Sequence, residues 1–150
     1  MHSYSHKYSE VYASKDAFLA DLGRIQSFVY DQTGILPTIY RFPGGSSNTV
    51  SNVSMKSLEL ELEKRNIRYF DWNVVSGDAS SRILGKDEIV RNCIEGVGSL
   101  ETAMILMHDL DEKVTTVEAL PEVIESFLDM GVEIAPISDE TEQIVHITTE

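Results

Sequence analysis

Two histidines near the start of the sequence, His2 and His6, are four residues apart. That spacing can place two imidazoles on one face of a helix, or let them clamp one ion from a tight turn. A zinc site also needs a third protein ligand, commonly a carboxylate, and no acidic residue precedes His2. On spacing alone, the pair fits a partial metal site or two solvated histidines near a terminus.

A third histidine, His108, directly follows the apolar run Ala103–Met107. Histidine titrates close to neutral pH, so a ring at the end of a buried strand suits a general acid or base. The alternative is a core histidine that is hydrogen-bonded to the backbone.

Other chemically useful side chains also follow predicted strands. Arg41 ends the first predicted strand before a glycine-rich turn at 44–47, and Asp71, Trp72 and Asp78 lie in and just after the second. Ligands of parallel α/β folds bind at the carboxyl ends of the strands, so we expect these residues on one face. Each also has a plainer interpretation: Arg41 in a sheet-edge ion pair, Trp72 in packing, Asp78 in an ordinary turn. The turn lacks the lysine of a P-loop, which argues against nucleotide binding.

Taken in order, these segments resemble the motifs of the polysaccharide deacetylase family, the metal-dependent enzymes of carbohydrate esterase family 4 that share the NodB homology domain. The resemblance covers about residues 2–137, with α/β spacing between the motifs. The matching segments are His2-Ser-Tyr-Ser-His6, Arg41-Phe-Pro-Gly-Gly45, Trp72-Asn-Val-Val-Ser-Gly-Asp78, Ile105-Leu-Met-His108-Asp109 and Thr116-Val-Glu-Ala-Leu-Pro121.

The resemblance implies an α/β fold, a distorted (β/α) barrel of the deacetylase type, with residues 1–150 forming the C-terminal part of the domain. It implies a hydrolase that removes N-acetyl groups from N-acetylglucosamine polymers such as peptidoglycan or chitin. The cofactor it implies is a divalent metal, expected to be zinc. The location it implies is extracellular or in the cell envelope.

Four site residues of the family carry over onto the first two motifs. His2 and His6 match the two metal-ligating histidines, and Arg41 matches the arginine that holds the catalytic base. Gly44 stands where the family usually has a tyrosine whose backbone N–H helps to stabilise the oxyanion. A backbone N–H donor is therefore still expected at this position, whereas the aromatic side chain that forms a wall of the site in the family is absent.

The later motifs supply the remaining site residues that the resemblance implies. His108 matches the general acid that protonates the leaving amine. Asp78 matches the aspartate that pairs with this histidine, and Asp71 is the competing choice. Trp72 falls in the same motif as Asp78 and is expected to bind substrate. Leu106 matches the apolar residue that lines the acetyl pocket.

One family motif has no counterpart in the 150 residues. A Thr-Phe-Asp-Asp segment, which supplies the catalytic base and the third metal ligand in the family, should precede His2. We therefore expect a partial barrel with its first strand missing, weak metal binding and poor deacetylase activity. The open edge of such a barrel is also expected to allow self-association.

Two other functions are considered beside the enzyme. A non-catalytic glycan-binding remnant of the same fold would need only a groove, with Trp72 and the Gly44-Gly45 turn contacting the sugar. An acidic α/β signalling domain is disfavoured, because no early acidic pair followed by a lysine loop is evident.

Alternating helices and strands must position these residues. Helices are predicted from Ser14 to Gln32, Ser54 to Asn66, Lys86 to Glu95, and from Thr115 or Thr116 to Gly131, where Thr115 and Glu118 fit a capping box. Strands are predicted at 38–42, 68–75, 103–107 and 132–137. Residues 144–147 fit a weak strand or disorder. The alternation predicts a parallel sheet in a doubly wound or barrel-type fold.

Composition sets the remaining limits. The net charge of −13, from 12 basic and 25 acidic residues, argues against a nucleic-acid partner, because phosphate binding needs clustered lysine and arginine. Residues 138–150 are expected to form an acidic tail. No apolar run approaches the roughly 18–20 residues of a membrane-spanning helix, and no secretory signal follows Met1. The single cysteine, Cys93, excludes an intrachain disulfide.

Overall fold

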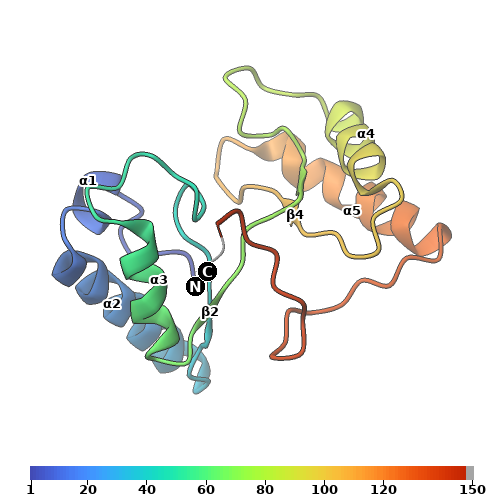
Figure 1. Ribbon diagram of the computed structural model, residues 1–150. Helices are drawn as coiled ribbons and strands as arrows, with labels where there is room; N and C mark the ends of the chain where they lie inside the picture. Colours follow the sequence, from blue (N-terminus) through green and yellow to red (C-terminus); the bar gives the residue numbers. More distant parts are fainter. Residues whose placement is uncertain (148–150) are drawn as a thin grey trace. The chain divides into compact units, whose positions relative to one another are not determined.

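The computed structural model describes residues 1–147, which form two compact units (Figure 1). The first unit contains residues 1–71 and 142–147, and the second contains residues 72–141. Each unit holds one pair of parallel strands among its described residues, as the helix–strand alternation predicts. Residues 148–150, the end of the expected acidic tail, lie outside the described residues. No helix within residues 1–147 has the length and apolar character needed to cross a membrane.

The first unit places helices around a short parallel strand pair. Strands β1 and β2 are in register, with Ile39 opposite Arg68 and Tyr40 opposite Tyr69, and helix α3 makes the crossover between them. The elements in chain order are α1 (Tyr8–Val11), α2 (Lys15–Thr33), β1 (Ile39–Tyr40), α3 (Met55–Glu63) and β2 (Arg68–Tyr69).

Helix α2 begins and ends where the sequence predicts. The Ser14 hydroxyl accepts a hydrogen bond from the backbone N–H of Ala17 at 3.1 Å, which satisfies one of the free donors of the first turn. Gly34 ends the helix with a φ of 71°, the left-handed conformation that favours glycine. The buried face of α2 includes Phe18 and Leu22, which pack into the apolar core of this unit.

Met1 lies along the edge of β1 that faces away from β2. Its amino group donates to the carbonyl of Ile39 at 2.7 Å, and its carbonyl accepts from the N–H of Arg41 at 2.9 Å. These two bonds place the next residue, His2, at the carboxyl end of β1. Ligands of parallel α/β folds bind at this carboxyl end of the strands.

Residues 143–147 lie along β2 and do not form a strand. The Gln143 side chain donates to the carbonyl of Tyr69 at 2.7 Å, and the N–H of Asp71 donates to the carbonyl of Ile144 at 2.8 Å. The Tyr69 hydroxyl donates to the carbonyl of Ile147 at 3.0 Å. The sequence predicts a weak strand or disorder for residues 144–147. The structure shows neither, because these side-chain and backbone bonds hold the segment without forming a strand.

The second unit is built from β3 (Val74–Val75), α4 (Lys86–Val97), β4 (Ile105–Leu106) and α5 (Val114–Asp129). Strands β3 and β4 are parallel, with Val75 opposite Leu106, and α4 and α5 pack side by side (Figure 1). Helix α4 packs closely against β3 at Gly96, where an added Cβ would lie only 2.5 Å from Cγ1 of Val74. The apolar core of the unit includes Ile89, Val90, Cys93, Ala119, Val123 and Phe127.

The single strand predicted at 68–75 is wrong, because this segment divides into β2 and β3. Each half pairs with a different neighbour: β2 with β1, and β3 with β4. Between them, the N–H of Asp71 bonds Ile144, and the N–H groups of Asn73 and Val74 both bond Met104. The change of partner ends one ladder and begins the other, although the β-forming residue types run through both.

Three other local predictions are also wrong. Residues 132–137 form no strand in the described structure. The predicted capping box at Thr115 is absent, because helix α5 begins at Val114 and its N-cap residue is Lys113, which makes no side-chain cap bond. The nearby Thr116 hydroxyl donates to Asp78 instead. Helix α3 ends at Glu63, since Asn66 adopts a φ of 54° that a helix cannot contain.

Candidate functional site

In the second unit, His108 and Asp78 form a directly bonded pair. Asp78 follows β3 and His108 follows β4, and the parallel register brings the carboxyl ends of the two strands to one edge. The ring Nδ1 of His108 lies 2.8 Å from Oδ1 of Asp78. The backbone N–H of His108 donates to Oδ2 at 2.7 Å. Asp78 therefore fixes both the ring and the backbone of this histidine.

The carboxylate of Asp78 is buried and held by further donors. Thr116 donates its hydroxyl to Oδ2 at 3.1 Å, and the backbone carbonyl of the same aspartate accepts from Lys113. Burial alone would raise the pKa of Asp78, but the hydrogen bonds from His108 and Ser76 outweigh it and leave the pKa below its usual value. An ionised carboxylate can only accept, so Nδ1 of His108 carries the proton and Nε2 is left for other chemistry.

Trp72 and Leu106 are the other predicted site residues of the second unit. Both are partly buried, Trp72 just before β3 and Leu106 as the last residue of β4. Their roles toward a substrate stay predictions.

In the first unit, the rings of His2 and His6 converge. Their Nε2 atoms lie 3.1 Å apart, and Nδ1 of His2 lies 2.9 Å from the carbonyl of Arg41. A ring that donates Nδ1–H to a carbonyl presents Nε2 as a ligand, the arrangement common at metal-binding histidines. Desolvation lowers the pKa of His2, with a smaller contribution from the nearby His6, and so favours the neutral ring that metals bind.

The donor pair fits two of the ligands of a zinc ion. Zinc–nitrogen bonds are about 2.0–2.1 Å long, so an ion bound by both rings requires nitrogens roughly as close as these two. No group of three or more histidine, cysteine or acidic side chains in residues 1–147 is arranged to hold a metal. The described residues thus bring together two nitrogen donors here and no third ligand.

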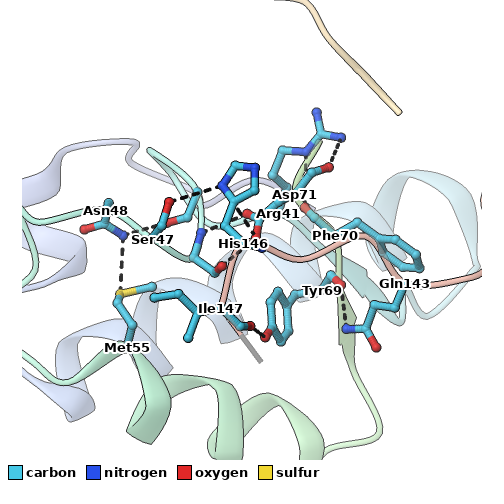
Figure 2. A network of polar contacts seen from close by, with 12 residues as sticks. Arg41, Ser47, Asn48, Met55, Tyr69, Phe70, Asp71, Gln143, His146 and Ile147 are labelled. Atoms are coloured by element: carbon cyan, nitrogen blue, oxygen red, sulfur yellow. Dashed lines mark hydrogen bonds and ion pairs between the residues drawn. The ribbon is translucent and has the colours of Figure 1, made fainter. Parts of the chain in front are cut away.

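Arg41 and Gly44 follow β1 in the same unit. The Arg41 guanidinium donates to the carbonyls of Phe70 at 3.3 Å and Asp71 at 3.2 Å, which crosses the carboxyl ends of β1 and β2 (Figure 2). Gly44 adopts a φ of 78°, and a Cβ there would meet the hydroxyl of Tyr8 at 3.3 Å. The glycine therefore permits a turn that a side chain would crowd.

Asp71, the competing partner for His108, has another role in the structure. Its buried carboxylate accepts from the N–H of Ser46 at 2.8 Å and from the Ser46 hydroxyl at 2.5 Å. It also accepts from the N–H of His146 at 2.8 Å (Figure 2). These bonds join the turn after β1 to the segment that ends the described chain. The ring of His108 is therefore bonded to Asp78. Asp71 instead connects Ser46 to His146 within the first unit, and we call this set of bonds the Asp71 clamp.

The same clamp contains a serine, a histidine and an aspartate that the sequence analysis did not connect. The hydroxyl of Ser47 lies 3.1 Å from Nδ1 of His146, and Oδ2 of Asp71 lies 4.0 Å from the same nitrogen (Figure 2). A catalytic triad requires serine and aspartate at opposite ring nitrogens, so this group is not arranged as one. No sequence signal joins these residues, because 99 positions separate Ser47 from His146.

A scan of the sequence against models of protein families finds no match, and neither does a search of curated protein sequences. Solved structures do match. The catalytic domain of a peptidoglycan N-acetylglucosamine deacetylase from Eubacterium rectale is 36% identical and has a TM-score of 0.92. The match covers 100% of this chain and 69% of that one.

Two further structures are more distant. A CE4 esterase from Streptococcus mutans is 26% identical with a TM-score of 0.74, and the match covers 89% of this chain and 60% of that one. A CE4 family pseudoenzyme from Bacillus anthracis is 19% identical with a TM-score of 0.66, covering 88% of this chain and 42% of that one. The last likeness is one of fold alone.

Proposed function

This chain belongs to the polysaccharide deacetylases of carbohydrate esterase family 4, and we propose that it carries the metal-binding and proton-donating parts of a hydrolase acting on N-acetylglucosamine polymers. The reaction replaces an amide by an amine and acetate. Water attacks the acetyl carbonyl, the carbon–nitrogen bond breaks, and the departing nitrogen needs a proton.

The bonded pair of Asp78 and His108 is the single observation that carries the proposal. Asp78 holds the ring through Nδ1, so Nε2 of His108 is directed to deliver a proton to the leaving nitrogen. The His108 side chain keeps 32% of its surface exposed while Asp78 keeps 2%, so the acid reaches solvent and the residue that orients it does not. In this proposal Trp72 contacts the sugar and Leu106 lines the space for the acetyl methyl.

The proposal assigns a divalent metal, zinc by its donor chemistry, to His2 and His6. When bound, such an ion supplies Lewis-acid polarisation of the acetyl carbonyl and a more acidic water. His2 is oriented for this role by the carbonyl of Arg41. The backbone N–H of Gly44 is proposed as a donor to the oxyanion, in a turn whose φ of 78° favours glycine.

The general base and third metal ligand are proposed to come from the Thr-Phe-Asp-Asp segment of the family, which the 150 residues do not include. We therefore propose weak activity for this chain by itself. A partial (β/α) barrel without its first strand stays a prediction, which a structure of the chain joined to that segment would test. Peptidoglycan or a chitin-like polymer is the proposed substrate, and the cell envelope or its exterior is the proposed location.

Acetate release from N-acetylglucosamine oligomers tests the proposal. The chain is assayed with zinc, alone and joined to a strand that bears the Asp-Asp pair. The joined chain should be faster by at least about a hundredfold, because general-base assistance contributes about 10²–10⁴-fold. In the joined chain, His108→Asn should lose most of the rate, whereas His146→Asn, which removes an imidazole with no proposed chemistry, should keep it. Equal rates for the chain alone and the joined chain would contradict the assignment of the base.

A non-catalytic glycan-binding protein is the second candidate. Its support is that the described residues form no complete metal site. A CE4 family pseudoenzyme shares the fold. This candidate predicts binding of N-acetylglucosamine oligomers with no acetate release, even from the joined chain. Loss of binding in Trp72→Ala would place the sugar as proposed.

A further inference from the structure

The buried carboxylate of Asp21, on helix α2, is hydrogen-bonded to the turn between His2 and His6. Oδ1 of Asp21 accepts the backbone N–H of Tyr4 at 2.8 Å, and Oδ2 accepts the backbone N–H of Ser5 at 3.0 Å. We propose that Asp21 is the positioning residue that sets the geometry of the two-histidine metal site. The inference rests on the proposed function, in which His2 and His6 bind the metal.

The turn has a shape that needs such an anchor. Ser3 has a φ of 71° and His6 a φ of 52°, the left-handed region that side-chain-bearing residues rarely adopt. Strained conformations of this kind persist where surrounding contacts determine them, and they cluster at functional sites. The hydrogen bond from the His6 N–H to the Ser3 hydroxyl at 3.0 Å closes the turn from within. The two bonds to Asp21 hold it from outside.

The anchor itself is rigid. Asp21 lies in the first half of α2, whose N-terminus is capped by Ser14. Phe18, one turn earlier, and Leu22, the next residue, are both buried in the core. Asp21 is itself only 7% exposed. The position of the carboxylate is therefore set by core packing and transmitted to the histidines through two backbone bonds.

Asp21 acts on the metal site through the backbone and is not a ligand. Both of its oxygens are already occupied by N–H groups of the turn. No group of three or more ligating side chains occurs in residues 1–147, so Asp21 does not complete the pair of imidazoles. In Asp21→Asn, an NH₂ group would face one of the two backbone donors. One bond would be lost, and the turn would relax.

The test is metal binding by the whole chain, measured by calorimetric titration with Zn²⁺ and by the visible absorption of bound Co²⁺. We expect Asp21→Asn to bind Zn²⁺ about 10–100-fold more weakly, the usual effect of changing a residue that supports a metal ligand. Its Co²⁺ spectrum at saturation should differ from that of the wild type, because the two rings no longer converge in the same way. Asp31→Asn removes an exposed carboxylate from the same helix and should change neither measurement.

Asp21→Glu provides a second variant in case the asparagine variant does not fold. It keeps the charge and displaces the carboxylate by one methylene, and it should also weaken Zn²⁺ binding. Wild-type affinity and an unchanged Co²⁺ spectrum in a folded Asp21 variant would overturn the inference and leave the metal proposal standing. If the wild type binds neither Zn²⁺ nor Co²⁺, the metal proposal fails, and the inference fails with it.

Discussion

The carboxylate of Asp78 holds His108 at two points, through the ring Nδ1 at 2.8 Å and through the backbone N–H at 2.7 Å. The same group also fixes the chain from which the ring projects. The orientation of the ring is thus tied to the end of strand β4, and substitutions of Asp78 should affect stability as well as chemistry.

Asp78→Asn should lower the free energy of unfolding at neutral pH by about 1–3 kcal/mol, since it weakens bonds to a buried acceptor. The pKa of Asp78 is depressed in the folded state, so its carboxylate contributes stability above the usual pKa of 3.8. That contribution is lost as the pH falls through the lower folded-state pKa. Denaturant unfolding from pH 7 to pH 2 should therefore show the two proteins converging in acid. A constant difference would mean that the ionised form of Asp78 is not what stabilises the fold.

In a chain joined to the Asp-Asp segment, Asp78→Asn should reduce kcat far more than it changes KM. The physical reason is that the variant leaves sugar contacts in place while it disturbs the tautomer and orientation of His108. Asp71→Asn is the informative comparison, because the structure gives Asp71 bonds to Ser46 and His146 instead. A larger loss of kcat in Asp71→Asn would favour Asp71 as the catalytic aspartate.

Zn²⁺ should raise the melting temperature of the wild type more than that of His2→Ala or His6→Ala. A ligand that binds only the folded state stabilises it by RT ln(1 + [L]/Kd), where [L] is the free metal concentration, so weak binding is measurable at high metal concentration. His146→Ala removes an imidazole outside the proposed site and should respond as the wild type does. Equal shifts in all four proteins would contradict the assignment of His2 and His6.

Glu59→Gln should stabilise the protein at neutral pH. Glu59 is 3% exposed, and neither of its carboxylate oxygens has a hydrogen-bond partner among the described residues. Burial raises the pKa of Glu59, so above pH 4.5 the folded state binds more protons than the unfolded state and stability falls as the pH rises. The gain should be about 1–3 kcal/mol at pH 7 and should vanish below about pH 4.

Glu63→Gln is the matched control, because Glu63 is exposed on the same helix. Its effect on unfolding should stay within about 0.5 kcal/mol at every pH. A stabilisation by Glu59→Gln that persists unchanged into acid would show that charge burial is not its cause.

Gly96→Ala should destabilise the protein by about 1–3 kcal/mol, the usual cost of overpacking. The new Cβ would lie 2.5 Å from Cγ1 of Val74, so α4 and β3 would have to separate. Gly23→Ala gives the opposite expectation, since nothing lies within 4 Å of a Cβ at that position of α2. Alanine there should stabilise by about 0.5–1 kcal/mol, and thermal melts of the two variants should move in opposite directions.

The sequence by itself determined the elements whose signals are local. The apolar face of α2, its Ser14 cap and its Gly34 terminus are encoded within one stretch of chain, and the helix forms where they predict. The alternation of helices and strands likewise predicted parallel pairing. The order of the motifs indicated the family, because residue types at fixed spacing can be recognised without a structure.

Only the tertiary structure decided which polar side chains meet. The division of 68–75 into β2 and β3 depends on partners elsewhere in the chain, and the bond from His146 to Asp71 spans 75 positions. The bonds from the 2–6 turn to Asp21 join a loop to a helix face that carries no chemical motif. Periodicity records which face of an element is apolar, whereas a buried carboxylate takes whichever donors the folded chain brings within reach. Those donors are set by packing between distant segments and leave no pattern in the local sequence.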